Sequence, residues 1–115
     1  MDSAREPGAG SSALQQALDR MWIQFLPMMT ERVAILETAA TAIAENQLSI
    51  EQREAAHGAA HKLAGALGTF GLNEGTLLAR EAEALYLNDQ PDSPPNPARL
   101  TEIAARLRTL IENRG

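Results

Sequence analysis

Two histidines spaced four residues apart carry the most distinctive chemistry in this sequence. They are His57 and His61, in the segment HGAAHKLAGALGTFG. On a helix with 3.6 residues per turn, residues four apart lie on one face. The other members of that face are small: Ala64, Gly65 and Gly68. Because glycine inside a helix costs roughly 1 kcal/mol relative to alanine, we interpret this bare face as a surface on which another molecule approaches an imidazole.

An imidazole on such a face can act as a nucleophile toward phosphorus. Histidine is largely neutral near pH 7, so a ring nitrogen is available to attack. Phosphoryl transfer depends chiefly on positioning and on neutralisation of charge. If a partner supplied the metal and the catalytic groups, this protein would need only an accessible, oriented imidazole. We therefore take His61 as the candidate phospho-acceptor and His57 as a neighbour that shapes the docking face.

A shared metal ion is an alternative use of the two histidines, since histidines at i and i+4 of a helix can bind one metal. The sequence has no further histidine and no cysteine. The remaining ligands would have to be carboxylates such as Glu54, Glu81 or Glu83. We predict no metal site, and we expect Glu81 and Glu83 to belong to a solvated helix face.

Hydrolytic catalysis would need a nucleophile beside a histidine and an orienting acid. Cysteine is absent, and Ser49 and Thr69 lie in no catalytic motif. We therefore predict no hydrolase activity.

Composition narrows the classes of protein further. The chain of 115 residues has the length of one domain, with 3% aromatic residues and a net charge of −5. Nucleic-acid binding is not expected, because it needs a clustered basic surface. No apolar run reaches the roughly 20 residues of a transmembrane helix, and no secretory signal is visible. We expect a cytoplasmic protein without a membrane partner.

The apolar spacing predicts an all-α fold, an antiparallel up-and-down four-helix bundle with an additional short N-terminal helix. Residues 1–10 are predicted to be a disordered lead-in, and residues 11–115 the bundle. The helices are expected at about 12–26, 30–46, 49–70, 73–87 and 97–113.

Capping and breaking residues give these bounds. Helix starts are predicted at potential N-caps, namely Ser12, Thr30, Ser49, Asn73 and Asn96. Pro27 is expected to end or kink the first helix, because proline lacks the backbone N–H. Gly71 is expected to stop the histidine-bearing helix in the left-handed conformation. The proline-rich residues 88–97 are predicted to be an exposed loop.

The segment HKLAGALGTFGL, which begins at His61, resembles the phospho-acceptor helix of histidine-containing phosphotransfer (HPt) domains of two-component phosphorelays. In that family the acceptor histidine lies mid-helix on a four-helix bundle. A small residue, usually glycine, follows at the fourth position, which is Gly65 here. Amphipathic helices precede and follow the segment, so the resemblance covers about residues 12–113.

The resemblance implies a phosphorelay intermediate without kinase or hydrolase activity. His61 would accept a phosphoryl group from the aspartate of a response-regulator receiver domain, or through a hybrid histidine kinase, and pass it to another receiver. This domain would bind no cofactor, and Mg²⁺ would be held by the receiver. We expect a monomer, since the docking face must stay free.

One position departs from the family pattern. Many members have a lysine at the third position after the histidine, where it neutralises the phosphoryl group, and this chain has Ala64 there. Lys62 is the candidate replacement, although it lies about 100° round the helix from His61. The missing lysine supports an alternative function, a non-catalytic helical module that binds a receiver-like partner without phosphorylation.

Overall fold

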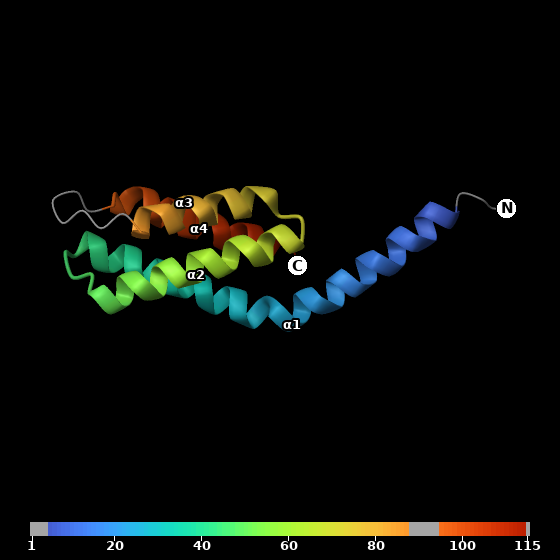
Figure 1. Ribbon diagram of the computed structural model, residues 1–115, viewed down its shortest axis with the longest axis horizontal. Coiled ribbons are helices and arrows are strands. Elements are labelled where there is room, and N and C mark those ends of the chain that lie inside the picture. The colour runs from blue at the N-terminus through green and yellow to red at the C-terminus, as the bar shows by residue number, and fades with distance from the viewer. Residues whose placement is uncertain (1–4, 88–94, 115) are drawn as a thin grey trace.

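The part of the chain that the structure describes contains four α-helices (Figure 1). The computed structural model describes residues 5–87 and 95–114, with side chains from residue 12 onward. The helices are α1 (Arg5–Ala44), α2 (Ile50–Thr69), α3 (Asn73–Leu87) and α4 (Pro97–Arg114). No strand occurs within the described ranges. The predicted all-α class is confirmed, whereas the predicted loop lies mostly outside the described residues.

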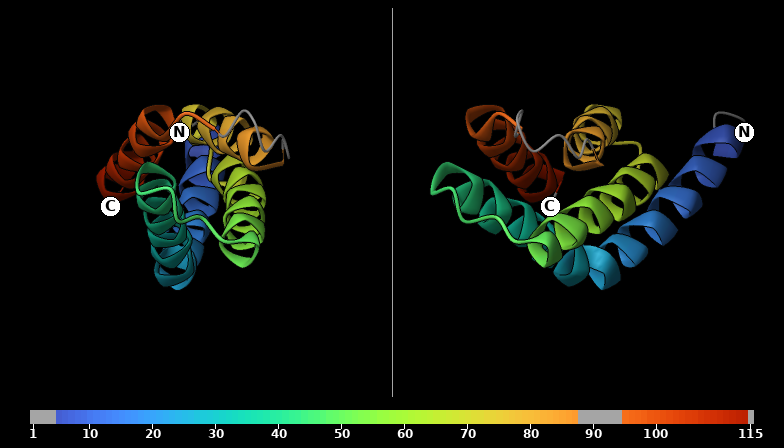
Figure 2. Two further views of the ribbon diagram at one scale, coloured as in Figure 1. Left: turned by 90° about the vertical axis from the view of Figure 1, so that its left-hand side faces the viewer. Right: turned by 60° about the vertical axis from the view of Figure 1, so that its left-hand side comes forward.

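Successive helices run antiparallel and surround a single core. Figure 2 shows them arranged as a square when the molecule is viewed along the bundle. α2 lies between α1 and α3, and α4 closes the square by packing against both α3 and α1. This is the up-and-down topology that short connections between amphipathic helices favour.

Small and large apolar side chains alternate in the core. α2 contributes mainly alanines together with Leu63 and Leu67, which are fully buried. The largest fully buried side chains of the other helices are Trp22, Met29, Val33, Tyr86, Ile103 and Leu107. The buried alanines allow the helix backbones to approach closely, so the inner face of α2 packs firmly in the core even though the residues on its outer face are small.

The separate N-terminal helix predicted at 12–26 does not exist, because α1 is one continuous helix of 40 residues. Pro27 lies inside it, and the predicted caps Ser12 and Thr30 are interior positions. The helix also includes residues 5–10, which had been assigned to the lead-in, while residues 1–4 lie outside the described part. Figure 1 shows α1 bending where its N-terminal part leaves the bundle, as a proline within a helix commonly causes.

Packing on both sides of Pro27 explains why the helix continues. Trp22 and Met29 are 1% and 0% exposed, and a spacing of seven residues places them on the same face two turns apart. Pro27 itself is exposed. The carbonyl of Ile23, which loses its helical partner, belongs to a residue that is 68% exposed and can bond to water. The core contacts therefore outweigh the local cost of the proline.

The boundaries around the histidine-bearing helix agree with the sequence. Ser49 and Gln52 form the predicted capping box, with N···O distances of 3.0 Å and 2.9 Å. Gly71 has a φ of 76°, so it reverses the chain after α2 in the left-handed region. The carboxamide oxygen of Asn96 accepts from the backbone N–H of Ala98 at 2.9 Å, which confirms the predicted start of α4.

α2 and α3 form a close antiparallel hairpin. The Thr76 hydroxyl donates to the carbonyl of Ala64 at 3.0 Å. At Gly75 the helices are so close that an added Cβ would lie 2.9 Å from Cδ1 of Leu67. These contacts fix the register of α3 against α2, and so decide which α3 side chains lie beside the histidines.

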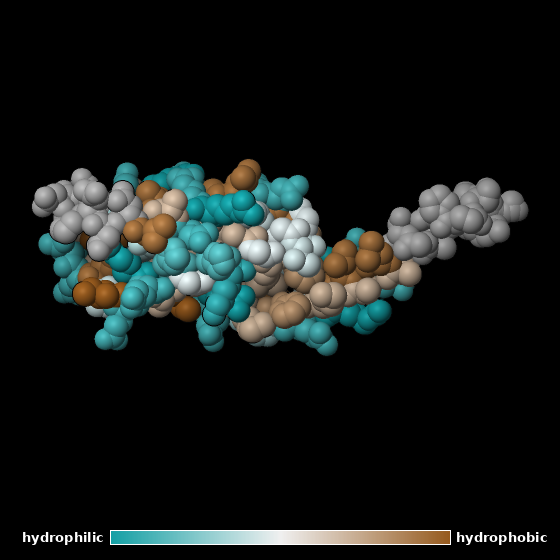
Figure 3. Space-filling model, viewed as in Figure 1, coloured by the Kyte–Doolittle hydropathy of each residue, from teal (hydrophilic) through white to brown (hydrophobic). Residues whose placement is uncertain are grey.

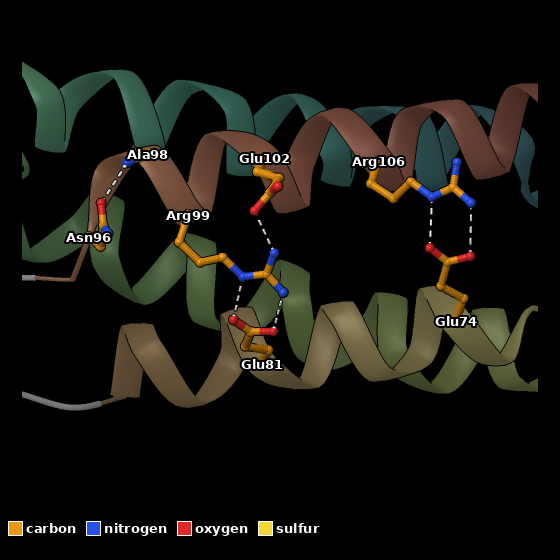
Figure 4. Close-up of polar contacts among 7 residues, drawn as sticks. All are labelled: Glu74, Glu81, Asn96, Ala98, Arg99, Glu102 and Arg106. Atoms are coloured by element: carbon orange, nitrogen blue, oxygen red, sulfur yellow. Dashed lines mark hydrogen bonds and ion pairs between the residues drawn. The ribbon is translucent and has the colours of Figure 1, made fainter.

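Ion pairs join α3 to α4 on the other side of α3 (Figure 4). Arg99 donates from two nitrogens to both carboxylate oxygens of Glu81, each at 2.6 Å. Arg106 binds Glu74 in the same way at 2.7 Å and 2.9 Å. These guanidinium groups hold the pKa values of both carboxyls below their ordinary values. The prediction that Glu81 belongs to a solvated helix face is therefore wrong, because its carboxylate pairs with Arg99.

The visible surface of the bundle in Figure 3 is mainly hydrophilic, and apolar colour gathers on α1 where it leaves the bundle. This part of α1 includes the exposed side chains of Leu14, Met21, Ile23, Phe25 and Met28. In the described residues, no helix combines the length and apolarity that crossing a membrane requires.

Candidate functional site

His61 projects from the middle of α2 with 71% of its side chain exposed. Its Nδ1 atom lies 2.8 Å from Oε2 of Glu83 on α3. Since a carboxylate oxygen can only accept a hydrogen bond, this contact favours the tautomer with the proton on Nδ1. The Nε2 atom then keeps its lone pair. The pair thus presents an accessible, oriented nitrogen nucleophile.

Glu83 is the residue that the sequence analysis missed. It had been assigned to a solvated helix face, but its side chain is 25% exposed and lies between two histidines. A signal was present, because His61 and Glu83 are 22 residues apart and their midpoint is Leu72. Residues equally distant from the turn of an antiparallel hairpin lie opposite one another, and this rule would have identified the pair.

His57 also lies near this carboxylate, with its Nε2 atom 3.8 Å from Oε2 of Glu83. It is less accessible than His61, with 33% of its side chain exposed. His57 lines a neighbouring hollow of about 630 Å³ that also includes Tyr86 and Leu87. Burial raises the pKa of the Tyr86 phenol to about 12. The two histidines thus share one carboxylate but face different hollows.

A hollow of about 430 Å³ opens directly beside His61. Its floor and walls come from both helices of the hairpin: His61, Ala64, Gly65, Arg80, Glu83, Ala84 and Leu87. A Cβ added at Gly65 would meet nothing within 4 Å, so the absence of a side chain there leaves open space beside the imidazole. The hollow is therefore accessible from outside along α2.

The remaining small residues of the predicted face differ in their surroundings. Ala64 lines the hollow but is only 5% exposed, so it belongs to the core and not to an open surface as predicted. Its methyl group lies on the buried face of α2 with Ala60 and Leu67, and the Thr76 hydroxyl holds α3 against this turn. Gly68 is exposed, yet an added Cβ would lie 3.3 Å from the Thr76 hydroxyl. Gly68 therefore also permits close helix packing.

Lys62 is exposed but is not among the residues that line the hollow. The cationic side chain that does line it is Arg80, on α3. Within the described residues no group of three or more histidine, cysteine, aspartate or glutamate side chains is arranged to hold a metal ion. The site therefore consists of an imidazole, a carboxylate, a guanidinium and open space.

Comparison with known proteins gives a family assignment. The family model for the Hpt domain matches residues 20–113. Protein RcaC of Microchaete diplosiphon is 36% identical over 66 residues, which cover 57% of this chain and 10% of that protein. The chain thus spans a small part of the length of this curated relative. No solved structure matches the chain.

The family match includes the whole of α2 and α3, α1 from residue 20 onward and α4 up to residue 113. Hpt domains are phosphotransfer modules of phosphorelays, and they interact with receiver domains and histidine kinases. The four-helix bundle and its exposed, oriented histidine are consistent with that role. The chain therefore belongs to the Hpt domain family.

Proposed function

We propose that this protein is a phosphorelay intermediate whose phospho-acceptor is Nε2 of His61. The observation that carries the proposal is the contact between Nδ1 of His61 and the Glu83 carboxylate. It favours the tautomer with the proton on Nδ1, orients the ring and leaves Nε2 with its lone pair on a side chain that is 71% exposed. No other histidine of the chain combines a short carboxylate contact with this degree of exposure.

The chemistry follows from this arrangement. Nε2 attacks the phosphorus of a receiver's aspartyl phosphate, and the new N–P bond forms as the P–O bond to the aspartate breaks. The aspartate leaves as a carboxylate. Nδ1 keeps its proton, so the phosphorylated ring carries a positive charge that Glu83 stabilises. The reverse reaction delivers the phosphoryl group to another receiver.

In this proposal the partner supplies the metal ion and the catalytic groups that this chain does not contribute. A receiver domain, phosphorylated by a hybrid histidine kinase or by another relay protein, docks over the His61 face with its Mg²⁺ in place. Gly65 leaves room for the incoming phosphorylated loop, and His57 borders the same surface. This domain itself has no kinase or hydrolase activity in the proposal, and it acts as a monomer.

The test is the intact mass of the protein after treatment with phosphoramidate. We expect the unaltered protein to gain one phosphoryl group that is labile in acid and stable in alkali. His61→Gln should gain none, while the matched variant His57→Gln should still gain one. Equal uptake by His61→Gln would exclude His61 as the acceptor.

The alternative function is a helical module that binds a receiver without accepting phosphate, and the observation that favours it is the alanine at position 64. It predicts that a phosphorylated receiver binds the unaltered protein but transfers nothing to it. Transfer to His61 would exclude this alternative.

A further inference from the structure

We infer that Arg80 is the cation that neutralises the phosphoryl group on His61, reaching it from α3. This inference rests on the proposed function. It assigns the phosphoryl-binding role to a residue on the neighbouring helix in place of Lys62, the replacement that sequence spacing alone indicates.

The charge at the site requires a cation. A phosphoryl group carries about −1.5 to −2 charge near neutral pH, and Glu83 places a further carboxylate 2.8 Å from the other nitrogen of the same ring. The phosphorylated ring carries one positive charge, which leaves the site with a net negative charge once the phosphoryl group and Glu83 are both counted. Ala64, on the next turn of α2, offers no charge.

Arg80 has the required position. It lies on α3 between Thr76, whose hydroxyl binds the carbonyl of Ala64, and Glu83, which contacts His61. Residues three and four apart share a helix face, so these three α3 residues all face α2. Arg80 accordingly lines the hollow beside His61 together with Gly65. Lys62 does not line that hollow.

Arg80 is also free to bind a phosphoryl group. The arginines of α4 at positions 99, 106, 108 and 114 each hold a carboxylate. By contrast, Arg80 is exposed and forms no ion pair with any side chain that the structure describes. A planar guanidinium binds phosphate oxygens through two parallel hydrogen bonds. An uncommitted arginine beside an open hollow is suited to this contact.

The experiment compares Arg80→Gln and Arg80→Lys with the unaltered protein. Arg20→Gln, which removes an exposed charge on α1, serves as the matched control. The first readout is the rate of phosphoryl uptake from phosphoramidate. The second is the pKa of the bound phosphoryl group, followed by ³¹P NMR. A purely structural role of Arg80 would leave that pKa unchanged, and circular dichroism melts verify the fold of each variant.

We expect Arg80→Gln to slow uptake by about tenfold, the scale of one charge-assisted hydrogen bond, and to raise the pKa of the phosphoryl group. Arg80→Lys should lie between this variant and the unaltered protein. Equal rates and equal pKa values in Arg80→Gln and the unaltered protein would overturn the role of Arg80 alone. An effect of Lys62→Gln without an effect of Arg80→Gln would assign the cation to Lys62. No uptake by the unaltered protein, from phosphoramidate or a phosphorylated receiver, would overturn the proposed function itself.

Discussion

α3 presents charged side chains to both of its neighbours, and the two interfaces use them differently. Toward α4, Glu74 and Glu81 are each held by two hydrogen bonds from an arginine. Toward α2, Glu83 contacts an imidazole, and Arg80 forms no ion pair with the described residues. We call the first interface closed, because both of these carboxylates have an arginine partner. We call the second open, because Arg80 has no ion-pair partner in the part of the chain that the structure describes. The paired charges link α3 to α4, whereas the guanidinium of Arg80, which has no ion pair among the described residues and lies beside His61, is available to a substrate.

Truncating one glutamate on each side of α3 tests whether the two interfaces differ in function. Glu83→Ala should slow phosphorylation of His61 by about tenfold to a hundredfold, the range found when a metal-bound histidine loses the carboxylate that orients its ring. Glu83→Gln should be milder, because its amide oxygen still accepts from Nδ1. The rate at which each variant takes up a phosphoryl group from phosphoramidate measures these two effects.

Glu81→Ala is the matched control for these variants. It removes a carboxylate two residues away that binds Arg99 and not a histidine. We expect a slightly lower melting temperature and an unchanged rate of phosphorylation. If Glu81→Ala slowed phosphorylation as much as Glu83→Ala does, the distinction between the two interfaces would be wrong.

A smaller effect is expected at the open space beside the imidazole. Gly65→Leu should weaken binding of a receiver by at least about tenfold, or about 1.4 kcal/mol, because its side chain would occupy the docking surface. Stability should not fall, since an added Cβ meets nothing within 4 Å and leucine favours helix. Titration calorimetry and thermal melts measure the two quantities.

Ala105→Leu controls for an added apolar side chain, because Ala105 is an exposed position on α4. This helix lies diagonally across the bundle from α2. The affinity of Ala105→Leu for the receiver should equal that of the unaltered protein. Equal binding by Gly65→Leu as well would show that the receiver docks elsewhere.

The smallest effect concerns pH at the closed interface. Arg99 lowers the pKa of Glu81 below its ordinary value of 4.5 in the folded protein. The stabilisation of the folded protein by this ion pair is therefore complete above about pH 4.5. It is lost as the pH falls through the lower pKa that Glu81 has in the folded protein, because the unfolded chain binds the proton first. Urea unfolding should give a stability difference between the unaltered protein and Glu81→Gln that is constant at neutral pH and shrinks in acid. A difference that grows in acid would contradict the assigned ion pair.

Most of the fold follows from local signals in the sequence. α2 starts at the cap Ser49, α4 starts at the cap Asn96, and α2 ends before Gly71. Each of these residues acts only on the backbone a few positions away from it in the sequence. The predicted break in α1 is wrong because core packing overrides the strong local signal of Pro27. The apolar positions Trp22, Met29 and Val33 remain in phase across the proline, and this continuity was the better guide.

The site was only partly predictable for a related reason. The spacing of His61 and Gly65 lies within one helix, so it can be read directly. Glu83 and Arg80 reach the site from α3, and their positions depend on the register between two helices, which Gly75 and Thr76 determine through contacts of a few ångströms. Sequence patterns identify the candidate nucleophile, but the groups proposed to orient it and to neutralise its product are brought to it by tertiary structure.

A ¹H–³¹P correlation spectrum of the phosphorylated protein identifies the histidine nitrogen that accepts the phosphoryl group. Phosphorus on Nε2 of a histidine couples through three bonds to both ring protons, Hδ2 and Hε1, whereas phosphorus on Nδ1 couples to Hε1 alone. Because Glu83 occupies Nδ1 of His61, we predict two correlations, both to His61. A single correlation to Hε1, or correlations to His57, would contradict the assignment of the acceptor atom.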